Sequence, residues 1–445
     1  MTQVSTEYRP HEKVNHTRQI VLIGVFFFIF GFITWINGTL IPYLKIACQL
    51  EEWQAYFVTF AFYIAYTVMA IPSGRLLQHT GMIGGMKWGL VTMAIGCMCF
   101  IPAALQREYL LFLVGLFVVG TGLTILQTAV NPYITLLGPS ASAARRISIM
   151  GICNKFAGMI APIVFGVIIL GNADELMKEL GRLDAAALAT RLDLLAQEVI
   201  LPYSVLVVIL LVLAMLIRFA HLPEIRQTTE HEEENTSKSL ASNKFSLRLF
   251  TGFTAIFCTV GVEVVAGDTI GNYGLYQGMS LDIAKMLTSY TLAAMMLGYV
   301  LGTLAIPRYI SQERAFVLSN TLALLILLGI LLLPGELSVY SVALLGFANA
   351  LLWPAIWPQA LRDLKGKQLH QASAVLIMGI AGGAIMPLLY GWAAAVIGNQ
   401  WAYALLIPCY LYNIAYWNLG EKERRQSVVY RKDGNFSVLI NKELE

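Results

Sequence analysis

Twelve long apolar stretches divide this chain of 445 residues, and they limit its fold more than any other feature. Each can cross a bilayer, which takes about 20 helical residues. Helices are expected because every backbone polar group must find its hydrogen bond inside the lipid. We therefore predict an all-α membrane protein with twelve transmembrane helices. The stretches lie near residues 20–44, 55–77, 86–104, 109–137, 147–170, 200–219, 249–276, 284–307, 314–333, 338–361, 371–397 and 401–418.

A short motif suggests that the chain is built from two similar halves. The pattern Gly-x-Ile-x-Pro-x-x-x-Gly occupies Gly158–Gly166 in the fifth stretch and recurs at Gly383–Gly391 in the eleventh. A six-plus-six repeat around a central site is the plan of one large class of transporters. We predict six-helix halves at 1–219 and 247–418, joined by a polar cytoplasmic linker at 220–246 and followed by a cytoplasmic tail at 419–445.

The positive charges predict the orientation. If both termini are cytoplasmic, the cytoplasmic segments hold 23 of the 30 Lys and Arg residues and the outer loops hold six. Cytoplasmic loops carry such an excess of positive charge. We therefore expect both termini in the cytoplasm and an uncleaved first span, because the first apolar stretch is too long for a signal peptide. The long outer loop at 171–199 carries Leu and Ala at helical spacing, which predicts a short surface helix.

Composition argues against several functional classes. All six histidines fall in tails or cytoplasmic loops, and the six cysteines show no metal-ligand spacing. No nucleophile–base set or phosphate loop is present, so the sequence predicts neither an enzyme nor a bound cofactor or metal. The net charge of +3 gives no basic field for nucleic acid. We expect a monomer whose partners are the lipid bilayer and a small molecule.

Only three charged residues lie well inside the apolar stretches: Lys155, Glu263 and Asp268. Charges at such depth are costly and mark ion or substrate pathways. Glu263 and Asp268 are five residues apart, about 140° around an ideal helix. Either the helix bends, or one acid faces a cavity while the other meets Lys155. We expect at least one acid to bind a cation, and the alternative is a purely structural ion pair with Lys155.

Amide and aromatic side chains inside the stretches predict a sugar site. Gln127 and Asn131 share one helix face, as do Trp353 and Trp357. Amides both donate to and accept from hydroxyl groups, while flat rings cover the C–H face of a sugar. The alternatives are hydrogen bonds between helices for the amides and a place at the membrane interface for the tryptophans.

At these positions the chain resembles the fucose–galactose–hexose symporter family of the major facilitator superfamily. The residues that carry the resemblance are Asn37–Pro42, Gln127–Pro139, Arg146, Asn154, Ile160–Pro162 and Leu222–Ile225. The resemblance implies the major facilitator fold and uptake of a monosaccharide by alternating access, driven by a co-transported cation. It also implies that Asn37, Gln127, Asn131 and Asn154 line the sugar cavity.

Two departures from the family concern its carboxylates. The acid that follows Asn in the first span of the family is Gly38 here, and the acid of its fucose-type members in the fourth span is Gln127. Side-chain coupling is then left to Glu263 or Asp268, with Lys155 as the counter-charge. The segments 149–155 and 266–270 are similar to the branch that holds N-acetylglucosamine permeases.

The sequence therefore predicts a cation-coupled symporter of the bacterial inner membrane for a hexose or N-acetylglucosamine. H⁺ and Na⁺ both remain open as the coupling ion. An exporter of drugs or metabolites from the same superfamily and a sugar sensor that does not transport are the alternatives.

Overall fold

The computed structural model describes residues 17–136, 143–171, 173–219, 240–306, 308–360 and 375–418, and the regular elements within these ranges are helices. They are α1 (Thr17–Trp35), α2 (Asn37–Ala47), α3 (Glu52–Ala55), α4 (Phe57–Gln106), α5 (Tyr109–Leu136), α6 (Ala143–Leu170), α7 (Ala173–Leu180), α8 (Ala185–Gln197), α9 (Ile200–Phe219), α10 (Leu240–Asp268), α11 (Ile270–Tyr276), α12 (Leu281–Ala284), α13 (Leu287–Ala305), α14 (Gln312–Leu332), α15 (Gly335–Asn349), α16 (Leu352–Ala360), α18 (Gly382–Ile397) and α19 (Asn399–Ala402), with 3-10 turns η2 (Gly379–Ala381) and η3 (Tyr403–Leu406). Residues 375–378 and 407–418 are also helical.

These helices match the predicted twelve spans. Ten segments of the described chain are long and apolar enough to cross a membrane. One of them runs through α4, which is two helices joined at Gly81. The φ of Gly81 is +70°, a backbone conformation that glycine adopts without steric strain. This segment therefore contains the second and third predicted spans, and residues 399–418 correspond to the twelfth. The predicted all-α membrane fold is confirmed.

Two spans are each divided into two helices. The first passes from α1 to α2 at Ile36, and the seventh passes from α10 to α11 at Thr269. Ile36 and Thr269 keep right-handed helical dihedral angles, and each hydrogen-bonds to the residues four before and four after it. Gly267 and Gly271 flank the second junction. Both spans therefore continue through these junctions as nearly unbroken helices.

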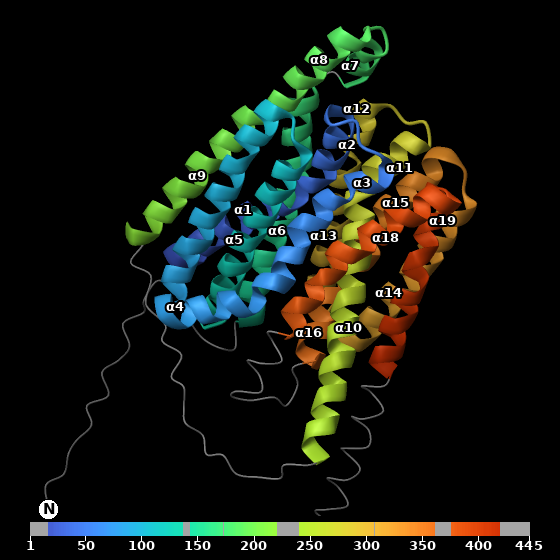
Figure 1. Cartoon of the computed structure of the whole chain (residues 1–445). Helices are drawn as coiled ribbons and strands as arrows, with labels where there is room; N and C mark the ends of the chain where they lie inside the picture. Colours follow the sequence, from blue (N-terminus) through green and yellow to red (C-terminus); the bar gives the residue numbers. More distant parts are fainter. Residues whose placement is uncertain are drawn as a thin grey trace, which may run out of the picture.

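The bundle consists of two groups of helices that meet along a central seam (Figure 1). In the first group α4 packs on α5 and α9, and α1 packs on α6; in the second, α13 and α14 pack on α15, and α10 packs on α18. The seam is formed mainly by α6 against α13 and by α4 against α18. The helices that meet at the seam are far apart in sequence, so tertiary packing holds the two groups together.

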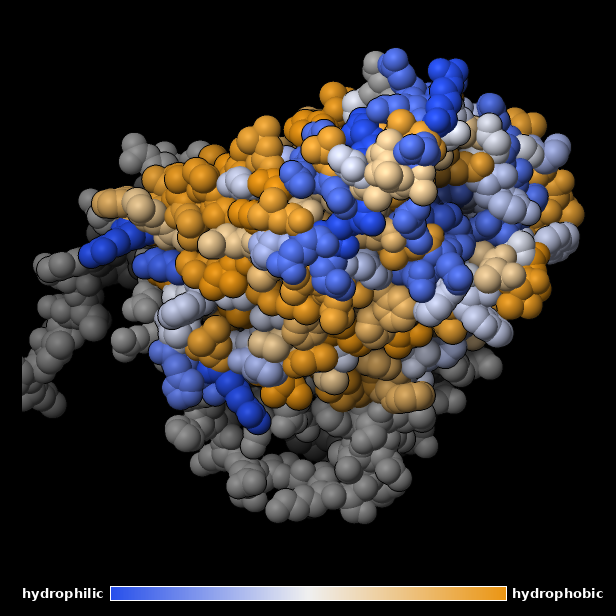
Figure 2. Space-filling model, turned by 45° about the horizontal axis from the view of Figure 1, so that its top comes forward, coloured by the Kyte–Doolittle hydropathy of each residue, from blue (hydrophilic) through white to orange (hydrophobic). Residues whose placement is uncertain are grey.

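One end of the bundle carries α7, α8 and the short helices α2, α3, α11 and α12, and we refer to it as the hairpin end (Figure 1). Polar residues gather at this end above a hydrophobic belt (Figure 2). The sequence predicted a single surface helix over 171–199, whereas the structure has two. The second begins at Ala185 because the Asp184 side chain caps it, accepting from the Ala187 N–H at 2.8 Å.

The predicted division between halves falls largely outside the described residues. Residues 220–239 and the tail at 419–445 are not among them. The helix α10 begins at Leu240, within the range predicted as linker.

Candidate functional site

Two of the three intramembrane charges form an ion pair across the seam. The Lys155 ammonium on α6 lies 2.5 Å from Glu263 Oε1 on α10, and both side chains are largely buried. The same ammonium lies 5.0 Å from the centre of the Trp35 ring and 5.9 Å from that of Tyr299. Cation–π contacts of this kind attract an ammonium group to the ring face. Glu263 is therefore the acid that meets Lys155.

Asp268 has a different environment. It is 0% exposed, and Thr59 Oγ1 of α4 donates to its Oδ2 at 3.2 Å. Its other oxygen, Oδ1, has no hydrogen-bond partner within the described part of the chain. No Lys or Arg of that part forms an ion pair with it. Asp268 is thus a buried acid without a counter-charge among the described residues, and it is the last residue of α10.

Trp35 fills the centre of the seam between the two halves. It is buried between Gly158 of α6 and Gly267 of α10, and a Cβ at either glycine would overlap its ring. On the other side it packs with Leu292 and Met295 of α13. The sequence did not predict a role for Trp35. The feature that could have pointed to it is its position in the middle of the first span, beside the polar residues that begin at Asn37.

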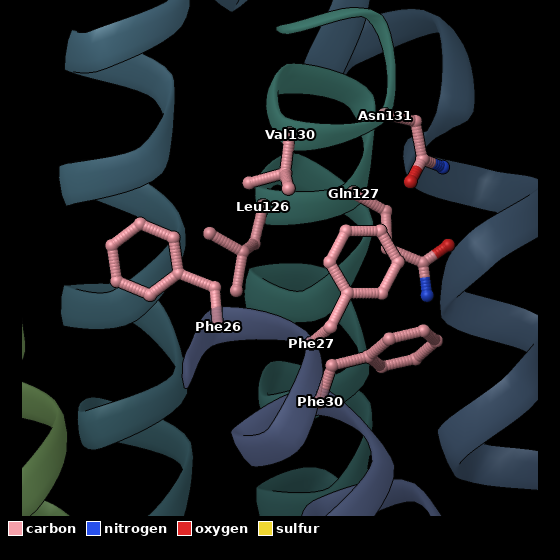
Figure 3. A pocket seen from close by; sticks show the side chains of 7 residues that line it. All are labelled: Phe26, Phe27, Phe30, Leu126, Gln127, Val130 and Asn131. Atoms are coloured by element: carbon pink, nitrogen blue, oxygen red, sulfur yellow. The ribbon is translucent and has the colours of Figure 1, made fainter. Parts of the chain in front are cut away.

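Gln127 and Asn131 lie on one face of α5, as their spacing predicted, and line a pocket between α5 and α1 (Figure 3). The Gln127 amide donates to the Tyr66 hydroxyl of α4 at 3.2 Å. The rings of Phe27 and Phe30 lie beside the Gln127 amide, and Asn131 lies further along α5 (Figure 3). The full lining is Phe26, Phe27, Phe30, Leu126, Gln127, Val130 and Asn131. Two amide side chains and three aromatic rings therefore line one small pocket.

The aromatic partners in this pocket are not the predicted tryptophans. Trp353 of α16 is partly buried and packs on the main hydrophobic core. Trp357 lies in α16, and its side chain is outside the described residues. The signal for the phenylalanines was present in the sequence, since Phe26–Phe28 and Phe30 fall within the first span together. The sequence did not predict that these phenylalanines line a pocket, because such a run is equally typical of a helix face that contacts lipid.

The remaining two predicted cavity residues are buried near α1. Asn154 of α6 donates from Nδ2 to the carbonyl of Phe27, a lining residue, at 3.4 Å. Asn37 begins α2 and is 1% exposed, and its Nδ2 has no partner among the described residues. Asn154 therefore supports the backbone of the pocket, while Asn37 leaves a donor available at the junction of α1 and α2.

Known proteins resemble this chain over most of its length. A profile of the Major Facilitator Superfamily matches residues 22–379. A glucose/galactose transporter of Brucella abortus is 34% identical over 411 residues, covering 92% of this chain and 95% of that protein. The L-fucose-proton symporter of Escherichia coli is 27% identical, covering 89% of this chain and 93% of that protein.

The fold is also that of solved transporters. The crystal structure of the transporter FucP in the outward conformation superposes with a TM-score of 0.69 at 25% identity, covering 90% of this chain and 98% of that one. An inward-facing bacterial homologue of the lysosomal transporter Spinster gives a TM-score of 0.65 at 12% identity, which speaks for the fold alone. The chain belongs to the major facilitator superfamily and, within it, to the fucose–galactose–hexose symporter family.

Proposed function

We propose that this protein takes up a monosaccharide by proton-coupled symport through alternating access. The observation that carries the proposal is the pocket of Figure 3, which is lined by Gln127 and Asn131 together with the rings of Phe27 and Phe30. We propose that Asn37 and Asn154 are the other polar residues of the sugar site. Trp353 and Trp357 remain candidates for contact with the sugar from further away. The glucose/galactose transporters among its relatives favour a hexose, with N-acetylglucosamine as the alternative.

Asp268 is the proposed site of the coupling ion. Glu263 already has its counter-charge in Lys155, so we assign that pair a structural role. Burying a carboxylate without a counter-charge costs far more free energy than burying the neutral acid. A proton removes that cost without needing the several oxygen ligands that Na⁺ would require. A relative named as an L-fucose-proton symporter also favours H⁺.

The position of Asp268 on the seam suggests how a proton could be coupled to closure. Its hydrogen bond to Thr59 joins α10 of one half to α4 of the other. When Asp268 is neutral, the halves can close over it. When it is ionised, a state that exposes it to water is favoured. Coupling is then a difference in stability between two conformations, which the proton and the sugar both shift.

The membrane orientation follows from the charge distribution. We propose that both termini are cytoplasmic, that the hairpin end faces the outside of a bacterial inner membrane, and that the protein is a monomer. The proposed halves are 1–219 and 247–418, with 220–246 as linker.

Transport by the purified protein in liposomes tests the proposal. Glucose, galactose and N-acetylglucosamine are compared by counterflow, which needs no driving force, and then by accumulation under an inward pH gradient. We expect accumulation of at least one sugar that a protonophore abolishes and that is unchanged when K⁺ replaces Na⁺ at fixed pH. Absence of saturable flux for all three would contradict sugar transport. Binding without flux would indicate a sensor, and flux of lipophilic cations instead would indicate an exporter.

A further inference from the structure

Two short helices at the hairpin end cap each other across the seam. Asp174 at the start of α7 accepts from the Leu281 N–H of α12 at 2.8 Å. In return, Asp282 of α12 accepts from the N–H groups of Ala173 and Asp174, at 3.2 and 3.4 Å. The first N–H groups of a helix lack partners within it, and carboxylates bind them well. Each helix therefore has, in its first turn, an acid that accepts hydrogen bonds from the first N–H groups of the other helix.

Lys285 strengthens the same junction. Its side chain is only 4% exposed, and its ammonium donates to Asp282 Oδ1 at 2.6 Å and to the Gly171 carbonyl at 2.5 Å. Gly171 lies directly after α6, so Lys285 satisfies a carbonyl at the end of that helix. The stem of Lys285 also lies against Gly166, where a Cβ would sit 3.4 Å from the Lys285 Cγ.

Apart from the Lys285–Asp282 pair, which lies within the second half, these contacts join opposite halves. Two other ion pairs at this end do not. Gly171 and α7 follow α6 of the first half, whereas α12 leads into α13 of the second. By contrast, Arg107–Asp193 and Glu179–Arg191 each lie within the first half. Movement of one half against the other would break the first set and leave the second set intact.

We propose that Asp174, Asp282 and Lys285 form an outer latch, which holds the hairpin end closed and must open in each cycle before sugar can enter from outside. This inference rests on the proposed function, because it assumes both the proposed membrane orientation and alternating access. Bonds that exist in only one of two states shift the equilibrium by their own free energy. Hydrogen bonds to charged groups contribute more than neutral ones. Weakening the latch therefore raises the population of the state that is open to the outside.

Thr39 provides a reporter for opening of the hairpin end. It is 0% exposed, and its hydroxyl lies 3.5 Å from the Pro162 carbonyl of α6 and 3.5 Å from the Lys285 carbonyl. A Thr39→Cys protein, with the six native cysteines replaced by Ser or Ala, is labelled in intact cells by a membrane-impermeant maleimide. The labelling rate then follows the fraction of molecules open to the outside.

We expect Asp282→Asn and Lys285→Met each to raise the labelling rate on the order of tenfold, the effect of losing a charge-assisted hydrogen bond. Asp193→Asn is the matched control, because it removes an ion pair at the same end without touching the seam. Its labelling rate should equal that of the parent protein. If Asp282→Asn does not fold, Asp174→Asn replaces it and should act in the same direction.

The latch is overturned if both variants label no faster than Asp193→Asn. Labelling requires neither sugar nor a gradient, so this outcome is separate from a failure of sugar transport. Faster labelling in a protein that shows no counterflow would support the latch and contradict only the proposed function.

Discussion

At the scale of single residues, Asp268 and Glu263 differ in what surrounds their carboxylates. Glu263 lies beside the Lys155 ammonium, while Asp268 has one hydroxyl donor and an oxygen without a partner in the described chain. The charge of Glu263 is therefore balanced by Lys155, whereas Asp268 has no counter-charge among the described residues. The two residues can be tested separately.

The Asp268→Asn variant keeps the size of the side chain and removes its titration. We expect the accumulation ratio of sugar under a pH gradient to fall to about 1, because closure is no longer linked to a proton. Counterflow should remain measurable. Glu336→Gln, which changes an acid at the start of α15, is the control and should accumulate sugar normally. Accumulation by Asp268→Asn equal to that of the control would remove Asp268 from the coupling mechanism.

The Gln127→Ala variant tests the pocket. Polar groups placed to meet hydroxyls lose that interaction, so we expect sugar affinity to weaken by roughly tenfold. Thr128→Ala is the control on the same helix, because its hydroxyl bonds to the Thr124 carbonyl of α5 itself. Affinity is measured by competition in counterflow. Equal affinities for the two variants would assign Gln127 to helix packing through Tyr66.

At the scale of elements, close approach of helices depends on small residues around Trp35. Gly267→Ala places a methyl group against that ring, so we expect a loss of about 1–3 kcal/mol in the free energy of unfolding. The double variant Gly267→Ala, Trp35→Leu should recover part of that loss. Gly74→Ala serves as control, because a methyl group there would meet no neighbouring group within 4 Å. Thermal unfolding in detergent compares these three variants with the parent protein.

The ion pair between α6 and α10 makes a second prediction at this scale. Removing one partner leaves a buried charge alone, at a cost of about 3–5 kcal/mol, whereas replacing both by apolar groups is often neutral. We therefore expect Lys155→Met to unfold at lower temperature than the double variant Lys155→Met, Glu263→Leu. Likewise, the single variant Glu263→Leu should unfold at a lower temperature than the double variant. A double variant less stable than either single variant would show that the pair contributes net stability.

At the scale of the whole molecule, the proposed orientation places the hairpin end on the outside of the membrane. Arg182 is exposed at the hairpin end and Arg308 is exposed between α13 and α14. In a cysteine-free background, we expect Arg182→Cys to react with an impermeant maleimide in intact cells and Arg308→Cys to react only after permeabilisation. The reverse pattern would invert the proposed topology and, with it, the assignment of the outer latch.

Membership of the major facilitator superfamily also confirms, at this scale, that the protein is a transporter and not an enzyme. The site could be predicted only in part. Spacing along one helix placed Gln127 and Asn131 on a common face, and depth in the membrane marked the three charges. Neither spacing nor depth says which other helix a face will meet, so the sequence did not predict that Phe27 and Phe30 would lie in the pocket with Gln127.

The sequence by itself determined the twelve spans, because hydropathy is a local property and lipid leaves the backbone no alternative to the helix. It also singled out Lys155, Glu263 and Asp268 as the charges within the apolar stretches, where charge is costly. Only the tertiary structure decided their partners. Lys155 meets Glu263 across 108 residues of chain, and Thr59 meets Asp268 across 209. Such pairs depend on how distant helices rotate and pack against one another, and no local pattern records that arrangement.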